Sequence, residues 1–206
     1  MQRGVDTVVA GVAAVALAPL LAAVAVLVRV RLGRPVLFRQ RRTGRDGVEF
    51  DIVKFRTMRD ERFPGEPDAD RAPAFGRRLR STSLDELPQL LNVLRGDMSL
   101  IGPRPTLPEQ VARYGPHERR RLELRPGLTG WAQVNGRNAI SWPERIELDV
   151  WYVDHRSLAL DVRILVRTVA RLLRPTGITG SGGVNPGFPG PDGGRSSPPP
   201  GMPPTG

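Results

Sequence analysis

The chain has 206 residues, with 31 basic side chains against 21 acidic ones and a formal net charge of +10. It contains no cysteine, which excludes a disulfide scaffold, a thiolate nucleophile and a thiolate zinc site, and its two histidines are too few for a histidine-based metal cluster. The basic balance indicates an anionic partner: a nucleic acid, a phosphorylated small molecule or a lipid surface.

An unbroken apolar run of 21 residues extends from Val8 to Val28. As a helix it would measure roughly 31 Å, about the thickness of the hydrocarbon core of a bilayer. Three interpretations fit it: a cleaved signal peptide, a single spanning helix, or a re-entrant hairpin that bends at Pro19. Seven arginines follow before the first acid, which predicts that this flank lies in the cytoplasm beside anionic headgroups. Residues 1–33 are therefore expected to form a membrane-inserted segment with a basic flank.

We expect a folded domain over residues 34–176, beginning with a β-hairpin. Two short strands are predicted at residues 36–40 and 49–56, on either side of turn-forming residues at 43–47. Residues 59–76 are polar and contain several prolines and glycines, which predicts a mobile loop.

Three helices are expected after this loop. The first begins at Ser83, which has capping-box spacing to Glu86 and is followed by leucines at helical intervals. A second start signal, Ser141-Trp142-Pro143-Glu144, precedes a helix over residues 144–153. A third helix, over residues 159–173, has a basic stripe and an apolar face, which fits either a membrane-surface helix or a core-facing helix with a solvated basic side.

The C-terminal residues 177–206 contain ten glycines and eight prolines in 30 positions, so we expect a disordered tail. The whole pattern predicts an α/β protein that is mainly helical with a small β-hairpin. It also predicts an N-terminal re-entrant or spanning membrane helix and surface amphipathic helices.

The strongest candidate for a catalytic group is the acid pair Asp85-Glu86, at the expected start of the first helix. A helix N-terminus favours anions and should keep a carboxylate ionised. An ionised carboxylate can serve as a nucleophile, a metal ligand or a base, whereas the plain alternative is helix capping. Pro88 breaks a local rule inside this helix, and such violations gather at functional sites.

Several arginines stand beside turn or proline residues. Arg104 lies between Pro103 and Pro105, which would hold its guanidinium ready for bidentate phosphate binding. Three further arginines have comparable settings or lie near the acid pair: Arg80, Arg125 and Arg137. Lys54 is the only lysine of the chain and falls at a predicted strand end.

Seven blocks of the sequence, in order, resemble the bacterial sugar transferases, the monotopic polyprenyl-phosphate phosphoglycosyl transferases. They are Arg39-Gln40, Lys54 to Met58, Leu79 to Gln89, Gly96 to Ser99, Gly102 to Pro105, Arg125 to Gly127 and Gln133 to Arg137. The resemblance runs from the apolar segment to about residue 174.

This resemblance implies a sugar-1-phosphate transfer from a UDP-sugar to a polyprenyl phosphate such as undecaprenyl phosphate, with release of UMP. Asp85 would attack the β-phosphorus to form a covalent phosphosugar intermediate, and Glu86 would help to hold Mg²⁺. Arg80, Arg104 and Arg137 match arginines that contact anionic substrate groups, and the Pro103–Pro105 segment matches a part associated with uridine. The rest of the implied substrate-binding set is Lys54, Arg56 and Arg125.

The resemblance also favours the re-entrant form of the apolar run, although Ala18-Pro19 stands where the family has Ser-Pro. The implied location is the bacterial cytoplasmic membrane, with the catalytic domain on the cytoplasmic face and membrane lipids as partners. The chain looks like the minimal catalytic unit of the family. The implied pathway is the first membrane step of exopolysaccharide, O-antigen or glycoconjugate assembly.

Two rival functions compete with this enzyme. The net charge of +10 fits a membrane-tethered nucleic-acid-binding protein, but the chain is only 5% aromatic and shows no binding motif, so no nucleic-acid partner is expected. The other rival is a structural membrane-surface protein whose acid pair only caps a helix. The sequence does not identify the sugar, the polyprenyl length or the oligomeric state.

Overall fold

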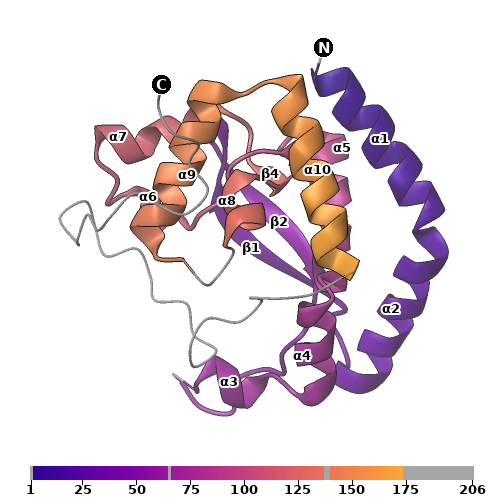
Figure 1. The fold of residues 1–206 in the computed structure, drawn as a ribbon. Coiled ribbons are helices and arrows are strands. Elements are labelled where there is room, and N and C mark those ends of the chain that lie inside the picture. Colours follow the sequence, from indigo (N-terminus) through magenta and orange to yellow (C-terminus); the bar gives the residue numbers. More distant parts are fainter. Residues whose placement is uncertain (1, 65, 137–139, 174–206) are drawn as a thin grey trace. The chain divides into compact units, whose positions relative to one another are not determined.

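The computed structural model describes residues 2–64, 66–136 and 140–173 (Figure 1). The chain divides into two compact units, one built from Met1–Gln40 and Asp51–Gly96 and the other from Arg41–Phe50 and Asp97–Gly206. The predicted α/β class, mainly helical with small sheets, is confirmed. The domain boundaries predicted at residues 33 and 176 stay a prediction, and the expected tail over 177–206 lies outside the described residues.

The first unit begins with two helices, α1 (Gln2–Ala16) and α2 (Ala18–Leu32), bent by 62° at the break between them (Figure 1). The bend falls at Leu17, because Pro19 occupies the first turn of α2, where its missing N–H is tolerated. Neither of these helices alone, nor any other helix in the described ranges, is long and apolar enough to cross a membrane, but α1 and α2 together pass that test. Most of their large apolar side chains are exposed, Val8, Val15 and Val30 among them.

The predicted hairpin is confirmed as strands β1 (Leu37–Thr43) and β2 (Glu49–Phe55), which pair in a two-stranded sheet. The short 3₁₀ turn η1 (Arg45–Gly47) joins them, and Asp46 adopts a positive φ of 55° there. Packing around the end of β2 forms one hydrophobic cluster, in which Val24 and Val28 of α2 meet Phe55 and Leu79. Helix α2 is thus part of the core of this unit.

The segment predicted as a mobile loop contains two helices, α3 (Asp68–Arg71) and α4 (Ala74–Ser81). Glu66 is buried before α3 and accepts hydrogen bonds from both Arg59 and Arg62. The sequence composition suggested a loop because it shows the prolines and glycines of this segment but not the ion pairs that link its residues.

The second unit contains a parallel pair of three-residue strands, β3 (Ser99–Ile101) and β4 (Gly127–Thr129), which the sequence did not predict. Besides η1, its described helical segments are α6 (Pro108–Val111), α7 (Pro116–Arg119), η3 (Arg120–Glu123), α8 (Trp131–Asn135), α9 (Trp142–His155) and α10 (Leu158–Leu173). The predicted start of α9 is confirmed, because Ser141 and Glu144 form the capping box with bonds of 3.3 and 2.7 Å.

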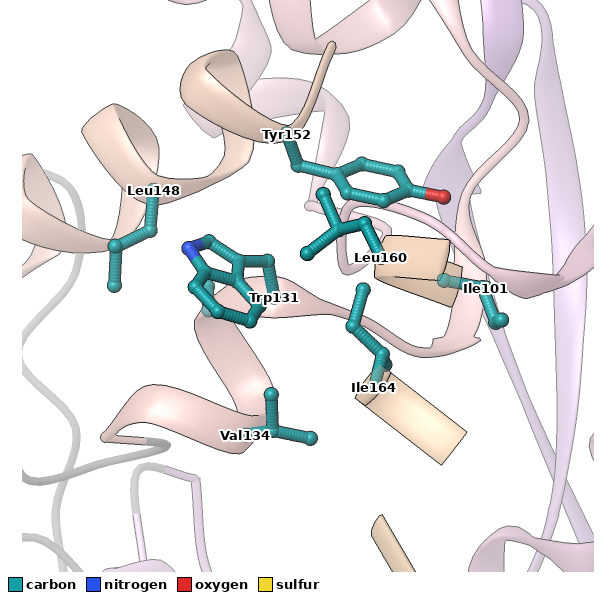
Figure 2. Packing of buried hydrophobic residues seen from close by; sticks show 8 residues of the cluster. Ile101, Trp131, Val134, Leu148, Tyr152, Leu160 and Ile164 are labelled. Atoms are coloured by element: carbon teal, nitrogen blue, oxygen red, sulfur yellow. The ribbon is translucent and has the colours of Figure 1, made fainter. Parts of the chain in front are cut away.

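The core of the second unit lies between α8, α9, α10 and β3. Figure 2 shows Trp131 packed in this cluster with Leu148 and Tyr152 from α9 and Leu160 and Ile164 from α10. The predicted third helix is confirmed as α10. Leu160 and Ile164 lie on its buried face. A second apolar strip of α10 remains exposed, comprising Leu158, Val162, Leu165, Val166 and Val169.

Candidate active site

The acid pair lies on η2 (Leu84–Gln89), a 3₁₀ helix that continues into α5 (Leu90–Arg95). The predicted α-helix with a Ser83 cap is wrong, because Ser83 has a φ of 58° and its side chain makes no capping bond. Pro88 supplies the reason, since in an α-helix it would lack an N–H and clash with the carbonyl of Leu84. The backbone instead forms the tighter bond from Glu86 N to Ser83 O, at 3.1 Å.

Lys54 supplies the positive charge beside this acid pair. Its Nζ lies 2.8 Å from Glu86 Oε1, and the two side chains are only 18% and 20% exposed. Asp85 itself is 7% exposed. The structure therefore brings Lys54, the only lysine of the chain, into an ion pair with Glu86, and the catalytic role of these residues stays a prediction.

Asn92 fixes the register between the acid-bearing segment and the strand that carries Lys54. Its side chain is fully buried, accepts from Val53 N at 3.1 Å and donates to Asp51 O at 2.8 Å. The amide side chain thus bonds the backbone of β2 much as a neighbouring strand would. Since Val53 precedes Lys54, this contact sets where the ammonium lies relative to Glu86.

Arg80 lies on α4 and binds the end of the same strand block. Its Nε donates to Thr57 Oγ1 at 2.9 Å. Gly76 makes this approach possible, because a Cβ there would lie 1.8 Å from the carbonyl oxygen of Thr57. The glycine and the arginine together attach α4 to the Lys54–Met58 block.

Arg56 has a structural part in this unit. It is 8% exposed, and its guanidinium donates to Met58 O, Arg34 O and Asp60 Oδ2 at 2.8, 2.7 and 3.1 Å. These bonds tie the strand end to the chain on both sides. Its implied role in substrate binding stays a prediction.

Arg104 and Arg125 belong to the second unit, where their two blocks lie side by side. Gly127 N donates to Pro103 O at 2.9 Å, and a Cβ at Gly102 would lie 2.3 Å from Arg125 O. Pro103 and Pro105 are buried, whereas Arg104 between them is partly exposed. Arg137 lies outside the described residues.

A buried ion pair lies beneath Arg104. Arg121 and Asp149 are bonded to each other, and Arg121 also donates to Tyr114 Oη at 2.6 Å and to Arg104 O at 2.9 Å. Burial disfavours the charge of Arg121, but Tyr114 and Asp149 outweigh it and raise the pKa of the guanidinium.

Arg145 lies near the same ion pair, with its Cζ 4.8 Å from the centre of the Trp142 ring. Burial, followed by the charge of Arg104, lowers the pKa of Arg145 to about 10. Arg104 and Arg145 are therefore close enough for their charges to repel.

Sequence reasoning missed Arg121, Asp149 and Tyr114. Arg121 closes a run of three arginines that reads as an exposed charged face. The sequence carries no clear signal for this pair, because only the burial of Arg121 and Asp149 distinguishes them from surface charges, and that burial is seen in the fold.

The acid pair has the oxygen ligands that a magnesium ion prefers. Mg²⁺ is usually held by one or two carboxylates together with substrate phosphates, and Asp85 with Glu86 supplies such a donor set. In the described part of the chain, no group of three or more acidic, histidine or cysteine side chains could enclose a metal ion. The residues fit an ion shared with a phosphorylated substrate, and they do not form an all-protein cage.

Comparison with known proteins identifies the family to which the chain belongs. The family described as bacterial sugar transferase matches residues 1–175. The chain is 51% identical over 173 residues to an uncharacterized sugar transferase, EpsL, of Bacillus subtilis, covering 77% of this chain and 86% of that protein.

Two further relatives have more informative names. One is a UDP-glucose:undecaprenyl-phosphate glucose-1-phosphate transferase of Xanthomonas campestris, 43% identical over 82% of this chain but only 38% of that protein. The other is the exopolysaccharide production protein ExoY of Sinorhizobium fredii, 37% identical over 82% of this chain and 83% of that protein. The chain therefore belongs to the bacterial sugar transferase family, and it is a phosphoglycosyl (sugar-1-phosphate) transferase.

Proposed function

We propose that this enzyme transfers a sugar-1-phosphate from a UDP-sugar to a polyprenyl phosphate such as undecaprenyl phosphate, and that UMP is released. The observation that carries the proposal is the buried Asp85 next to the Lys54–Glu86 ion pair, in a chain whose Xanthomonas relative is named for this reaction. The name of ExoY supports a place in exopolysaccharide assembly, as its first membrane step. UDP-glucose is the first donor to test.

The transfer proceeds in two displacements. A carboxylate oxygen of Asp85 attacks the β-phosphorus, the bond from that phosphorus to the bridging oxygen breaks, and UMP leaves with the electron pair. A phosphate oxygen of the lipid then attacks the same phosphorus and displaces Asp85, which yields the polyprenyl diphosphate sugar. Because the acceptor is already an anion, neither step needs a strong general base, and positioning and charge neutralisation dominate catalysis.

Basic side chains share the charge neutralisation. Lys54 keeps Glu86 oriented and compensates its charge, and Arg80, Arg104, Arg125 and Arg137 bind anionic substrate groups. Arg56 holds the end of the strand that carries Lys54. A bound Mg²⁺ held by Asp85 and Glu86 would neutralise diphosphate charge and favour the leaving group.

The acceptor places the reaction at a membrane. The exposed apolar side chains of α1 and α2, and those on the exposed strip of α10, are surfaces that a lipid phase would cover. The arginines after α2 favour the cytoplasmic face of a bacterial inner membrane. We propose that α1 and α2 enter one leaflet as a re-entrant hairpin, because their bend of 62° is larger than a continuous helix would show.

The proposal is tested by incubating the full chain in detergent or lipid nanodiscs with Mg²⁺, undecaprenyl phosphate and a series of UDP-sugars. We expect lipid-dependent UMP release from at least one donor. The variant Asp85→Asn should abolish it, whereas Asp46→Asn, in an exposed turn whose positive φ asparagine tolerates, should leave it unchanged. No release from any donor, or release that continues without lipid acceptor, would contradict the proposal.

A further inference from the structure

The buried guanidinium of Arg121, in the second unit, bonds to three different groups. The side chains of Arg121 and Asp149 are each 1% exposed and form an ion pair. Arg121 also donates through Nη1 to Tyr114 Oη, at 2.6 Å, and through Nη2 to the peptide oxygen of Arg104, at 2.9 Å. The ion pair is thus attached directly to the backbone of the residue between the two prolines.

The chain around Arg104 is held at successive residues. Pro103 O accepts from Gly127 N at 2.9 Å. On the other side, Thr106 Oγ1 accepts from Tyr114 Oη at 3.2 Å, and Thr106 O accepts from Thr43 N at 2.9 Å. With φ fixed at both prolines as well, the backbone of residues 103–106 has little freedom left.

A buried ion pair such as Arg121–Asp149 contributes little net stability to a fold. Moving two charges out of water costs several kcal/mol for each ion, and a well-packed apolar replacement is often as stable. A buried pair is more useful where it imposes one conformation. Here the group that it immobilises is the peptide oxygen of Arg104.

We propose that Arg121, held by Asp149 and Tyr114, is a positioning residue that aims the side chain of Arg104 at the anionic substrate. The role of Arg104 in substrate binding rests on the proposed function. Arg121 and Asp149 touch the reacting groups only through Arg104, so their loss acts through that residue.

The charges around Arg104 support the same geometry. Its charge contributes to lowering the pKa of Arg145, after burial, so the two guanidiniums lie within electrostatic range. Arg145 is in turn placed against the Trp142 ring. The charge of Arg104 thus acts both on the cation Arg145 and on the buried carboxylate Asp149, so a displacement of Arg104 would change the field that a bound phosphate meets.

The test is a double-mutant cycle with Arg104→Ala and Arg121→Lys. Lysine keeps the charge at position 121 but cannot reach Asp149, Tyr114 Oη and Arg104 O together, because it lacks the planar fork. Misplacement of a substrate-binding group by about 1 Å can cost on the order of a hundredfold in rate. We expect Arg121→Lys alone to lower kcat/KM for the UDP-sugar by roughly ten- to a hundredfold, and by less than about threefold in the Arg104→Ala background.

The matched control is Arg120→Lys, the same substitution one residue earlier. Arg120 pairs with Asp154 on the surface, where the two side chains are 39% and 41% exposed. We expect this variant to keep the wild-type kcat/KM. Tyr114→Phe, which removes one hydroxyl and no charge, provides a milder second variant and should give a smaller loss that also disappears in the Arg104→Ala background.

A second measurement does not depend on activity. Hydrogen exchange of the peptide that covers residues 102–107 should be faster in Arg121→Lys than in wild type, and unchanged in Arg120→Lys. Unchanged exchange in Arg121→Lys, or losses of activity that simply multiply with that of Arg104→Ala, would overturn the inference. An inactive wild-type enzyme would instead contradict the proposed function, and the exchange measurement would still decide the positioning role.

Discussion

Lys54 can be singled out in the sequence as a candidate site residue, but its partner Glu86 is seen only in the fold. It is the only lysine among 31 basic residues, and it lies 2.8 Å from Glu86. A compact ammonium fits between a strand end and a carboxylate, whereas a guanidinium is a wider planar group that favours two-point binding. Its presence in the predicted substrate-binding set came from the resemblance, and its contact with the acid pair comes from the fold.

Neutralising Lys54 should impair catalysis more than folding. In Lys54→Gln, Glu86 loses the ammonium that pairs with it. The proposed function makes Glu86 a metal ligand, and the loss of a group that orients such a ligand predicts a fall in kcat/KM of roughly ten- to a hundredfold. The free energy of unfolding should change by less than about 1 kcal/mol, since the pair is partly exposed. Steady-state kinetics and chemical denaturation measure the two effects. Arg41→Gln, which removes an exposed pair with Glu49 at 3.9 Å, is the control and should alter neither.

Gly76 should tolerate no side chain. A Cβ would lie 1.8 Å from the carbonyl oxygen of Thr57, so Gly76→Ala must push α4 away from the strand end. Alanine gains about 0.5–1 kcal/mol over glycine within a helix, but overpacking costs about 1–3 kcal/mol, so we expect net destabilisation. In the control Gly11→Ala the new Cβ would meet only Leu94, at 4.0 Å, and only the gain should remain. Thermal unfolding measures the Tm of both variants. Equal Tm changes in Gly76→Ala and Gly11→Ala would contradict the close approach of residue 76 to Thr57.

Single residues explain why part of the site was hidden from the sequence. The blocks around Lys54, Asp85 and Arg104 stand out by local pattern: a lone lysine, an acid pair with capping-box spacing, and an arginine between two prolines. Arg121 and Asp149 do not, since an arginine run and an acid on a helix are ordinary on a surface. Only burial distinguishes them, and burial depends on helices that meet in three dimensions.

At the scale of elements, ion pairs to Glu66 link the residues of the segment between β2 and α4. Arg59 bonds both to Glu66 and, through its N–H, to Arg71 O at 3.0 Å, so the two ends of the segment are close. The hydrogen bond from Arg59 lowers the pKa of Glu66 from 4.5 to about 2, with burial opposing and Arg62 assisting.

This shift predicts a pH dependence of the segment. The folded pKa of Glu66 lies below its unfolded value, so its stabilising contribution is complete above about pH 4.5 and is lost as the pH falls toward 2. Hydrogen exchange of residues 58–72 should therefore be constant from pH 7 to 5, after correction for the intrinsic rate, and accelerate below. Glu66→Gln should show the faster exchange already at pH 7. Protection that persists in Glu66→Gln would show that the ion pairs do not order this segment.

Helix starts show what local sequence can predict. Ser141 and Ser83 have the same capping-box spacing to a glutamate, yet only Ser141 forms the box. The difference is proline position: Pro143 lies in the first turn of α9, where it is tolerated, whereas Pro88 lies inside the segment and enforces 3₁₀ geometry. The parallel pair β3–β4 could not be predicted, because each strand has three residues and its partner is remote in sequence.

At the scale of the whole molecule, attachment to a membrane rests on the helix pair α1–α2. Their exposed valines and leucines are the apolar surface that the proposed re-entrant hairpin would bury in lipid, and such a hairpin would leave both ends of the pair on one face. A spanning helix would place those ends on opposite faces.

The natural absence of cysteine makes this testable with single cysteines. In inverted membrane vesicles, a membrane-impermeant maleimide should label both Gly4→Cys and Arg31→Cys, and in right-side-out vesicles it should label neither. Leu20→Cys, next to the bend, should be protected in both preparations until detergent is added. Labelling of positions 4 and 31 from opposite sides would establish a spanning helix.

The central claim is that phosphorus becomes bonded to an oxygen of Asp85 during turnover. The most direct measurement is mass spectrometry of the enzyme after brief exposure to a donor UDP-sugar without lipid acceptor, followed by acid quenching and proteolysis. We predict a hexose-phosphate adduct on the peptide that contains Asp85, formed with one equivalent of UMP and discharged by undecaprenyl phosphate. An enzyme that turns over while residue 85 never carries phosphorus would contradict the account.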